Sequence, residues 1–306
     1  MHNPEDNAAY VRRVHDKGLR FDMRTMSRRK LLAAFGGAGT LAVLAACGSE
    51  DTPSTSSSAP ASSSGSLTEV ESETAGPFPA DGSNGPDVRT LDGIVRKDIR
   101  SSFGDASGTA AGVPLEFSLV VNDLNGKAVT GAAVYAWHCD REGRYSLYSD
   151  GVTDQNYLRG IQETDATGKA TFTSIFPACY SGRWPHIHFE VYSSLADATD
   201  GDGPIVKTSQ IALPETDADA VYATDGYSAS VRNLSQVSLA TDNVFGNDSA
   251  RTELATMSGS VTDGYRATLT IAIDPSGEEE GGGGRGGTPP GGGPGGTPPS
   301  GPPPGN

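Results

Sequence analysis

Positive charge is scarce in this chain of 306 residues, which holds 23 Lys and Arg against 38 Asp and Glu and has a net charge of −15. The imbalance is larger beyond Ala46, where 15 basic and 34 acidic residues remain. A surface this acidic repels the phosphate backbone of DNA and RNA. We therefore expect no nucleic acid among the partners, and the charge does not favour large anionic substrates either.

An apolar run long enough to cross a membrane is lacking as well. The run Leu31–Ala46 is shorter than the roughly 20 residues that a spanning helix needs, and it follows the pair Arg28-Arg29. A basic segment followed by a short apolar run is typical of an export signal, and the twin arginines predict the Tat type. Residues 1–25 precede the signal, so Met23 or Met26 is a candidate for the true start.

The end of that signal resembles a bacterial lipobox. It reads Leu-Ala-Ala-Cys and ends at Cys47, which predicts cleavage before this cysteine and lipid attachment to its sulfur. We therefore expect an exported protein, anchored by lipid on the outer face of the cytoplasmic membrane. An ordinary cleaved signal with an incidental cysteine is the alternative.

Cysteine is rare, with three in the whole chain. Beyond Cys47 only Cys139 and Cys179 remain, so at most one disulfide can form within the exported chain. Export to an oxidising compartment favours that disulfide, and two buried free thiols are the alternative.

The two ends of the chain after the signal are poor in large apolar residues. Residues 48–66 are mainly Ser, Pro, Ala and Thr, which predicts a flexible linker. Residues 276–306 hold 14 of the 40 glycines and 8 of the 20 prolines, and we expect this tail to be disordered because it cannot bury a core. Residues 67–275 remain as one domain, and residues 1–47 form the extension and signal.

Short runs with strand-like alternation, separated by Gly, Asp and Asn turns, fill that domain. The predicted strands are Leu115–Val121, Ala132–Cys139, Lys169–Phe176, His186–Tyr192, Val206–Leu213 and Ala267–Ile273. One short helix is expected after Pro214. This pattern predicts an all-β fold, a β-sandwich, in which the loops 140–164 and 179–185 carry most of the unusual polar residues.

The strand HIHFEVY carries the strongest chemical signal. Side chains alternate along a strand, so His186, His188 and Glu190 point to one face. Two imidazoles with this spacing can reach one metal ion, although such a pair alone is weak evidence. Two tyrosines in turns precede the strand, at Tyr145 and Tyr180.

Four segments in order resemble the intradiol ring-cleavage dioxygenases, a family that includes the catechol and protocatechuate dioxygenases and exported single-domain relatives. The segments are WHCDREGRYSLY, YLRGIQETDATGKATFTSIFPACY, SGRWPHIHFEVY and KTSQIAL. The resemblance covers residues 76–213. It implies an intradiol dioxygenase-like β-sandwich with long active-site loops.

The resemblance also implies a ligand set for iron. Tyr145 lies in the family's G-x-Y-S turn, Tyr180 follows its PxxY turn, and His186 and His188 match its H-[IV]-H strand. Two phenolates are hard anionic donors, which favour Fe(III) over Fe(II). The implied reaction cleaves a catechol between its two hydroxyls with O2 to give a muconate-type diacid.

Three side chains receive a catalytic role from the same resemblance. Tyr180 would leave the metal and take a proton from the catechol, a general-base role. Arg183 matches an arginine that steadies the bound substrate anion, and Gln210 matches a glutamine that lines the same pocket. The implied partners are therefore a catechol and O2, with the specific catechol left open.

Each of these residues also has a plainer interpretation. The two tyrosines could be ordinary loop aromatics. His138 is expected to be a structural hydrogen-bonding residue, and Arg159 to support a loop. Glu190 shares the histidine face, but the resemblance does not make it a ligand.

Two other functions stay open for the chain as a whole. It could be a surface-tethered β-sandwich that binds carbohydrate or protein without catalysis, or a metal protein without this reaction. No long helical stretch precedes Leu115, which argues against the helical dimerisation of cytosolic catechol enzymes and leaves the oligomeric state open.

Overall fold

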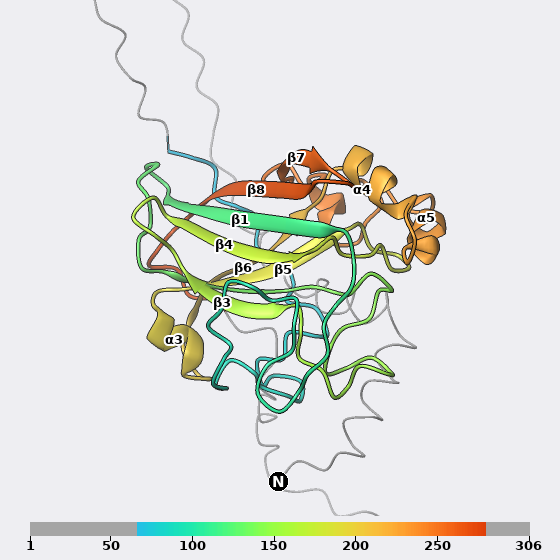
Figure 1. The fold of residues 1–306 in the computed structure, drawn as a ribbon. Helices are drawn as coiled ribbons and strands as arrows, with labels where there is room; N and C mark the ends of the chain where they lie inside the picture. The colour runs from blue at the N-terminus through green and yellow to red at the C-terminus, as the bar shows by residue number, and fades with distance from the viewer. Residues whose placement is uncertain (1–65, 280–306) are drawn as a thin grey trace, which may run out of the picture.

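The computed structural model of the protein describes residues 66–279. The predicted export signal, the lipid attachment at Cys47, nearly all of the linker and most of the Gly/Pro tail lie outside these residues. Within them, the predicted all-β architecture is confirmed. Two four-stranded sheets pack face to face, and short helices lie at their ends (Figure 1).

The first sheet has the strand order β4-β1-β8-β7, and the second has the order β3-β2-β5-β6. In the first sheet β1 pairs antiparallel with β4 and parallel with β8, whereas every pair in the second sheet is antiparallel. The strands are β1 (Pro114–Asp123), β2 (Ala133–Trp137), β3 (Arg159–Glu163), β4 (Lys169–Ile175), β5 (His186–Tyr192), β6 (Ile205–Ala212), β7 (Thr256–Ser260) and β8 (Gly264–Ile273).

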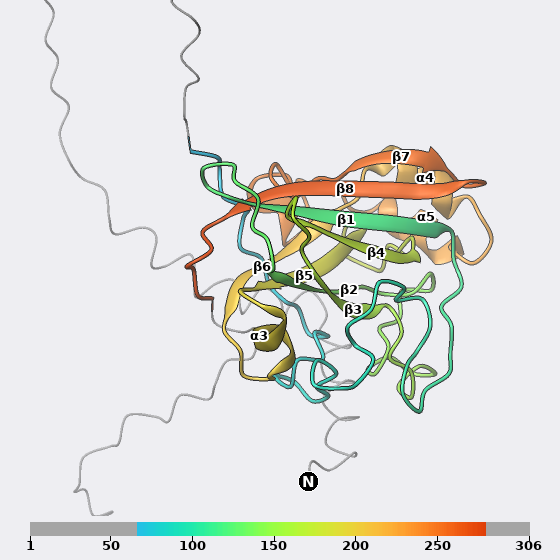
Figure 2. The same ribbon diagram turned by 60° about the vertical axis from the view of Figure 1, so that its left-hand side comes forward.

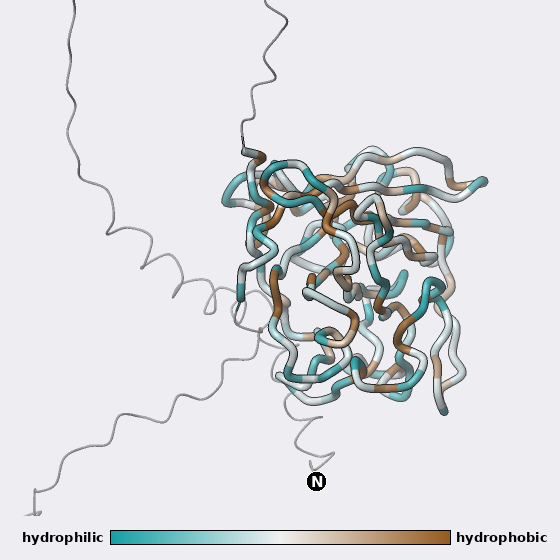
Figure 3. Tube along the Cα trace, turned by 90° about the vertical axis from the view of Figure 1, so that its left-hand side faces the viewer, coloured by the Kyte–Doolittle hydropathy of each residue, from teal (hydrophilic) through white to brown (hydrophobic). Residues whose placement is uncertain are grey.

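The central strand β5 is buried on both faces, and this explains why all seven of its residues are buried. Ile187, Phe189 and Val191 face the other sheet and join the main hydrophobic core. The opposite face, with His186 and His188, is covered by loops from the N-terminal part of the domain and from the region after β2 (Figures 1 and 2). Apolar segments lie mostly inside these layers and hydrophilic ones at the turns (Figure 3).

All six predicted strands form, and the helix predicted after Pro214 is α4 (Glu215–Tyr222). Strands β3 and β7 were not predicted, because neither has an alternating apolar pattern. RGIQE has a single large apolar residue, and the same is true of TMSGS, which is largely exposed in the structure. The helices α3 (Leu195–Thr199) and α5 (Ser228–Leu234) and the 3-10 turn η2 (Phe245–Asn247) were also missed. No helix between residues 66 and 279 has the length and apolar character to cross a bilayer.

The described structure continues beyond Pro275, where the sequence predicted the domain to end. The backbone N–H of Glu279 donates to Ile205 O at 2.7 Å. Its carboxylate accepts from Thr208 N at 2.7 Å and lies 3.1 Å from Lys207 Nζ. These contacts tie the first residues of the predicted tail to the edge strand β6.

The disulfide favoured by the sequence does not form, because Cys139 and Cys179 are free buried thiols. Each thiol contacts a different carbonyl: Cys139 Sγ lies 3.5 Å from Ala178 O, and Cys179 Sγ lies 3.3 Å from Arg183 O. Burial raises the pKa of Cys179 to about 12. Both groups therefore act as small core residues, and the alternative interpretation of the cysteines is correct.

Candidate active site

The four residues predicted to bind iron meet at one point. His186 Nε2 lies 3.1 Å from His188 Nε2, 3.2 Å from Tyr180 Oη and 3.5 Å from Tyr145 Oη. Donors that each sit about 2.1 Å from one metal ion are at most about 4.2 Å apart. Strand β5 supplies the two histidines, and the loop after β2 and the loop between β4 and β5 bring the two phenols over them.

The protonation of His186 follows from its surroundings. Its Nδ1 lies 2.5 Å from Trp184 O, a carbonyl that can only accept, so Nδ1 carries the proton and Nε2 presents a lone pair. Burial, and then the charge of Arg183, lowers the pKa of His186 well below its usual value. A neutral imidazole with a defined tautomer is the form that binds a metal.

The ring of His188 packs against an aromatic residue, Trp137, and lies close to a glycine, Gly76. Its ring stacks on Trp137 with the centroids 5.0 Å apart and the planes 3° from parallel. A Cβ at Gly76 would lie 3.2 Å from His188 Cε1, and this glycine has a φ of +70°, so a larger residue there would be strained. Burial and the neighbouring His186 lower the pKa of His188 well below its usual value.

The two tyrosines differ in their exposure. Tyr145 is 1% exposed, and its ring lies 4.8 Å from the ring of Phe78. Burial, and then the nearby Tyr180, raises the pKa of Tyr145 well above its usual value. Tyr180 is half-buried, and its ring meets that of Tyr145 edge to face at 5.9 Å. A bound cation is what would let such closely spaced phenols ionise.

Arg159 supports the Tyr145 loop, as the sequence predicted. Its guanidinium is fully buried and donates to Ser146 O at 3.0 Å, Ser146 Oγ at 3.1 Å and Phe78 O at 2.8 Å. The prediction for His138 is confirmed too. Its Nε2 lies 2.7 Å from Ser174 Oγ and its Nδ1 2.8 Å from Cys139 O, so both ring nitrogens have structural partners.

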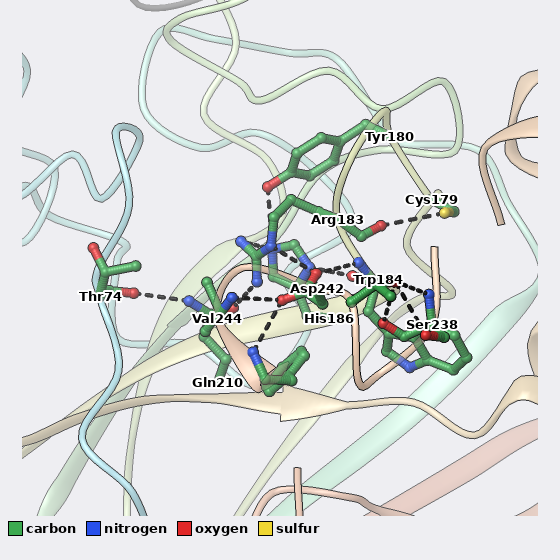
Figure 4. A network of polar contacts seen from close by, with 12 residues as sticks. Thr74, Cys179, Tyr180, Arg183, Trp184, His186, Gln210, Ser238, Asp242 and Val244 are labelled. Carbon is green, nitrogen blue, oxygen red and sulfur yellow. Dashed lines mark hydrogen bonds and ion pairs between the residues drawn. The ribbon is translucent and has the colours of Figure 1, made fainter. Parts of the chain in front are cut away.

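The two residues predicted to handle substrate, Arg183 and Gln210, lie next to each other beside His186 (Figure 4). Arg183 Nη1 is 3.5 Å from His186 Nε2, and Arg183 Nη2 donates to Gln210 Oε1 at 2.6 Å. Gln210 Nε2 donates to Thr74 O at 2.8 Å. The Gln210 amide therefore links the Arg183 guanidinium to the backbone at Thr74. The catalytic role predicted for Gln210 stays a prediction.

Asp242 is a component of this region that the sequence did not reveal. Its Oδ2 accepts from Arg183 Nε at 3.0 Å and forms a buried ion pair. The sequence around it, TDNVF, has no feature that separates it from the many other acidic residues, and it lies 32 residues past Gln210. Only the folded chain brings it to the arginine.

Glu190 does not join the histidines. Its carboxylate accepts from Tyr192 Oη at 2.6 Å, and burial raises its pKa to about 8. In the part of the chain that the structure describes, no three His, Cys, Asp or Glu side chains are placed to hold a metal. The donor set is thus two imidazoles and two phenols. Such a set suits Fe(III), because hard phenolate oxygens favour the ferric ion.

Comparisons with known proteins bear on the sequence and fold around this site. The profile of a family described as "Dioxygenase" matches residues 85–198. Chlorocatechol 1,2-dioxygenase of Rhodococcus opacus is 36% identical over 66 residues, which cover 22% of this chain and 26% of that protein. Catechol 1,2-dioxygenase 1 of Acinetobacter lwoffii is 31% identical over an alignment of 102 positions, covering 27% of this chain and 33% of that protein.

A solved structure extends the likeness to the whole domain. The intradiol ring-cleavage dioxygenase from Tetranychus urticae has a TM-score of 0.55 and 24% identity, covering 70% of this chain and 98% of that one. This match shows a shared fold. The chain spans between a quarter and a third of the length of the curated relatives it matches. The described domain thus has the fold of an intradiol ring-cleavage dioxygenase, and its residues 85–198 match the dioxygenase family profile.

Proposed function

We propose that this protein is a ferric-iron dioxygenase that cleaves catechol-type rings between the two hydroxyls. The observation that carries the proposal is the meeting of four donor atoms, because three of them lie 3.1–3.5 Å from the fourth, His186 Nε2. Two curated relatives are named as a chlorocatechol and a catechol 1,2-dioxygenase, and these names support the substrate class.

In this proposal Tyr145, Tyr180, His186 and His188 hold the iron. The iron would supply a Lewis acid for the two catechol oxygens and a centre through which the ring reacts with O2. Overall one catechol and one O2 give one muconate-type diacid, both oxygen atoms entering the product, so no external reductant is needed. This balance suits an enzyme that works outside the cytoplasm.

The side chains of the site have separate tasks. Tyr180 Oη, at the half-buried end of the site, accepts a proton from one catechol hydroxyl. Arg183 Nη1 lies next to His186 Nε2, and from there the guanidinium stabilises the negative charge on the reacting ring. The burial of Tyr145, Trp137 and both histidines keeps water from the enclosed side of the site.

The test is O2 uptake by the iron-loaded protein across a panel of catechols, with mass analysis of the products. The proposal expects a red-brown protein, because tyrosinate-to-iron charge transfer absorbs visible light, and a product heavier than the substrate by one O2. A colourless preparation that cannot be loaded with iron would instead favour a surface-tethered binding module. A coloured protein that consumes no O2 with any catechol would favour a metal protein with another role.

We further propose that the protein is exported and lipid-anchored at Cys47. The twin arginines and the lipobox-like sequence support this, and both lie outside the described residues. Incorporation of labelled fatty acid into the wild type, and its loss in Cys47→Ser, is the expected result. Equal labelling of the two proteins would refute the anchor.

A further inference from the structure

Asp242 accepts four hydrogen bonds through one buried carboxylate. Oδ2 accepts from Arg183 Nε at 3.0 Å and from Trp184 N at 2.7 Å. Oδ1 accepts from Val244 N at 2.8 Å and from Phe245 N at 3.0 Å. Its side chain is 0% exposed and that of Arg183 is 4% exposed, so water does not compete for these bonds. The carboxylate fixes the arginine, the start of β5 and its own loop at once.

This arrangement requires a group that only accepts hydrogen bonds. An asparagine at position 242 would place its NH2 group against two N–H donors in either orientation, toward Arg183 and Trp184 or toward Val244 and Phe245. The charge matters as well. Arg183 is a buried cation, and Asp242→Asn removes the negative charge that is paired with its Nε next to the proposed iron ligands.

The same segment also restrains the guanidinium from a second direction. The ring of Phe245 lies 5.8 Å from Arg183 Cζ, in cation–π contact. With Nε held by Asp242 and Nη2 by Gln210, the plane of the guanidinium is fixed and Nη1 faces His186 Nε2 at 3.5 Å. The segment 242–245 lies outside residues 85–198, the part that the family profile matches.

We propose that Asp242 is a positioning residue. It orients the guanidinium plane of Arg183 so that Nη1 faces His186, where the substrate would bind, and it offsets the positive charge of Arg183 beside the proposed iron site. The consequence for catalysis rests on the proposed function. The placement of Arg183 does not, because it is a property of the folded chain without metal.

Two variants of equal charge provide the test. Asp242→Asn removes the acceptor, and Asp219→Asn removes an exposed carboxylate from the neighbouring helix α4. The first readout is the Nε–H signal of Arg183 in ¹⁵N-arginine-labelled, metal-free protein, assigned by its loss in Arg183→Lys. The second readout is the pair of values KM and kcat for catechol, determined separately. The rate is expressed per bound iron, and the visible absorption band is recorded for each protein.

The proposal expects the Arg183 signal of Asp242→Asn to shift and its proton to exchange fast with water. It also expects KM to rise roughly tenfold or more at equal iron content, since a charge-assisted bond to the arginine is lost. Asp219→Asn should match the wild type in both. A variant Asp242→Asn whose only change is a lower Tm would overturn the proposal, because a merely structural carboxylate predicts that result.

Two outcomes call for a further variant or measurement. If Asp242→Asn does not fold, Asp242→Glu keeps an acceptor-only group but moves it by one methylene, and should shift the Arg183 signal and raise KM by less. An unchanged signal and KM in Asp242→Glu would then overturn the proposal. If the wild type consumes no O2 with any catechol, the proposed function fails, and the Arg183 signal alone decides the positioning role.

Discussion

Arg159 offers a measure of how strongly the Tyr145 loop depends on one buried side chain. We expect Arg159→Met to destabilise the protein although the two side chains have similar length. The substitution leaves Ser146 O and Phe78 O without the donor that they have in the structure, whereas Pro79 O keeps its bond from Tyr135 Oη at 2.6 Å. A buried acceptor that loses its partner costs about 1–3 kcal/mol, so two of them give about 2–6 kcal/mol.

Part of that cost is recovered, because methionine does not have to bury a charge. A net loss of about 2–4 kcal/mol follows from the lower half of the range. For a domain of this size 1 kcal/mol corresponds to about 2–4 °C, so we expect the Tm to fall by about 4–16 °C. The assay is thermal unfolding of metal-free protein, followed by iron content after loading, which should also fall because Ser146 adjoins Tyr145.

The control is Arg232→Met, an exposed arginine in α5, which should change the stability by less than about 0.5 kcal/mol. If the Tm of Arg159→Met stays within a degree of that control, the hydrogen bonds of the guanidinium do not carry the loop, and the reasoning is refuted.

Three further predictions concern the ligands and the buried carboxyls. Tyr180→Phe should shift the visible band and slow turnover by roughly tenfold or more, because a ligand and a base are lost together; an unchanged spectrum would remove Tyr180 from the site. His188→Ala should abolish iron binding, whereas His138→Ala, which loses the structural hydrogen bonds of its two ring nitrogens, should retain iron; equal iron in both by elemental analysis would contradict the ligand assignment. Burial, and then the nearby Glu73, raises the pKa of Glu253 from 4.5 to about 9, so the folded state holds a proton that the unfolded chain releases. The resulting stability is full below about pH 4.5 and is lost as the pH rises to about 9, so the Tm should fall over that window, and less steeply in Glu253→Gln.

The sequence predicted the strands that have an alternating apolar pattern, and it predicted the ligand set by motif. The strands are confirmed, the ligand set stays a prediction, and the strands and the shared face of the two histidines could be predicted for a local reason. Alternation reports which face of a strand is buried, and His186 and His188 lie on one face because they are two residues apart. The placement of Tyr145 and Tyr180 over that face is not local, and the family resemblance supplied it.

The missed features depend on tertiary contacts. Strand β7 is mostly exposed, and it forms because it pairs with β8 rather than because it has a strand-like pattern. The cysteines lie close in sequence to the two tyrosines predicted as ligands, which suggested a bridge, yet their thiols contact separate carbonyls. The role of Asp242 could not be predicted from the sequence for the same reason, because its partner Arg183 lies 59 residues away.

If the proposed iron site is right, the unequal burial of the two phenols indicates which tyrosine would exchange with a substrate. Tyr145 is enclosed by Phe78 and His188, and Arg159 fixes the loop beside it, so its ring has no room to swing away. Tyr180 is half-buried, on a loop outside the regular strands. A ligand that leaves the metal to make room for a catechol oxygen must move within a densely packed interior, where small voids are rare. Of the two, only the more exposed tyrosine meets that condition, which independently favours Tyr180 as the ligand that becomes the base.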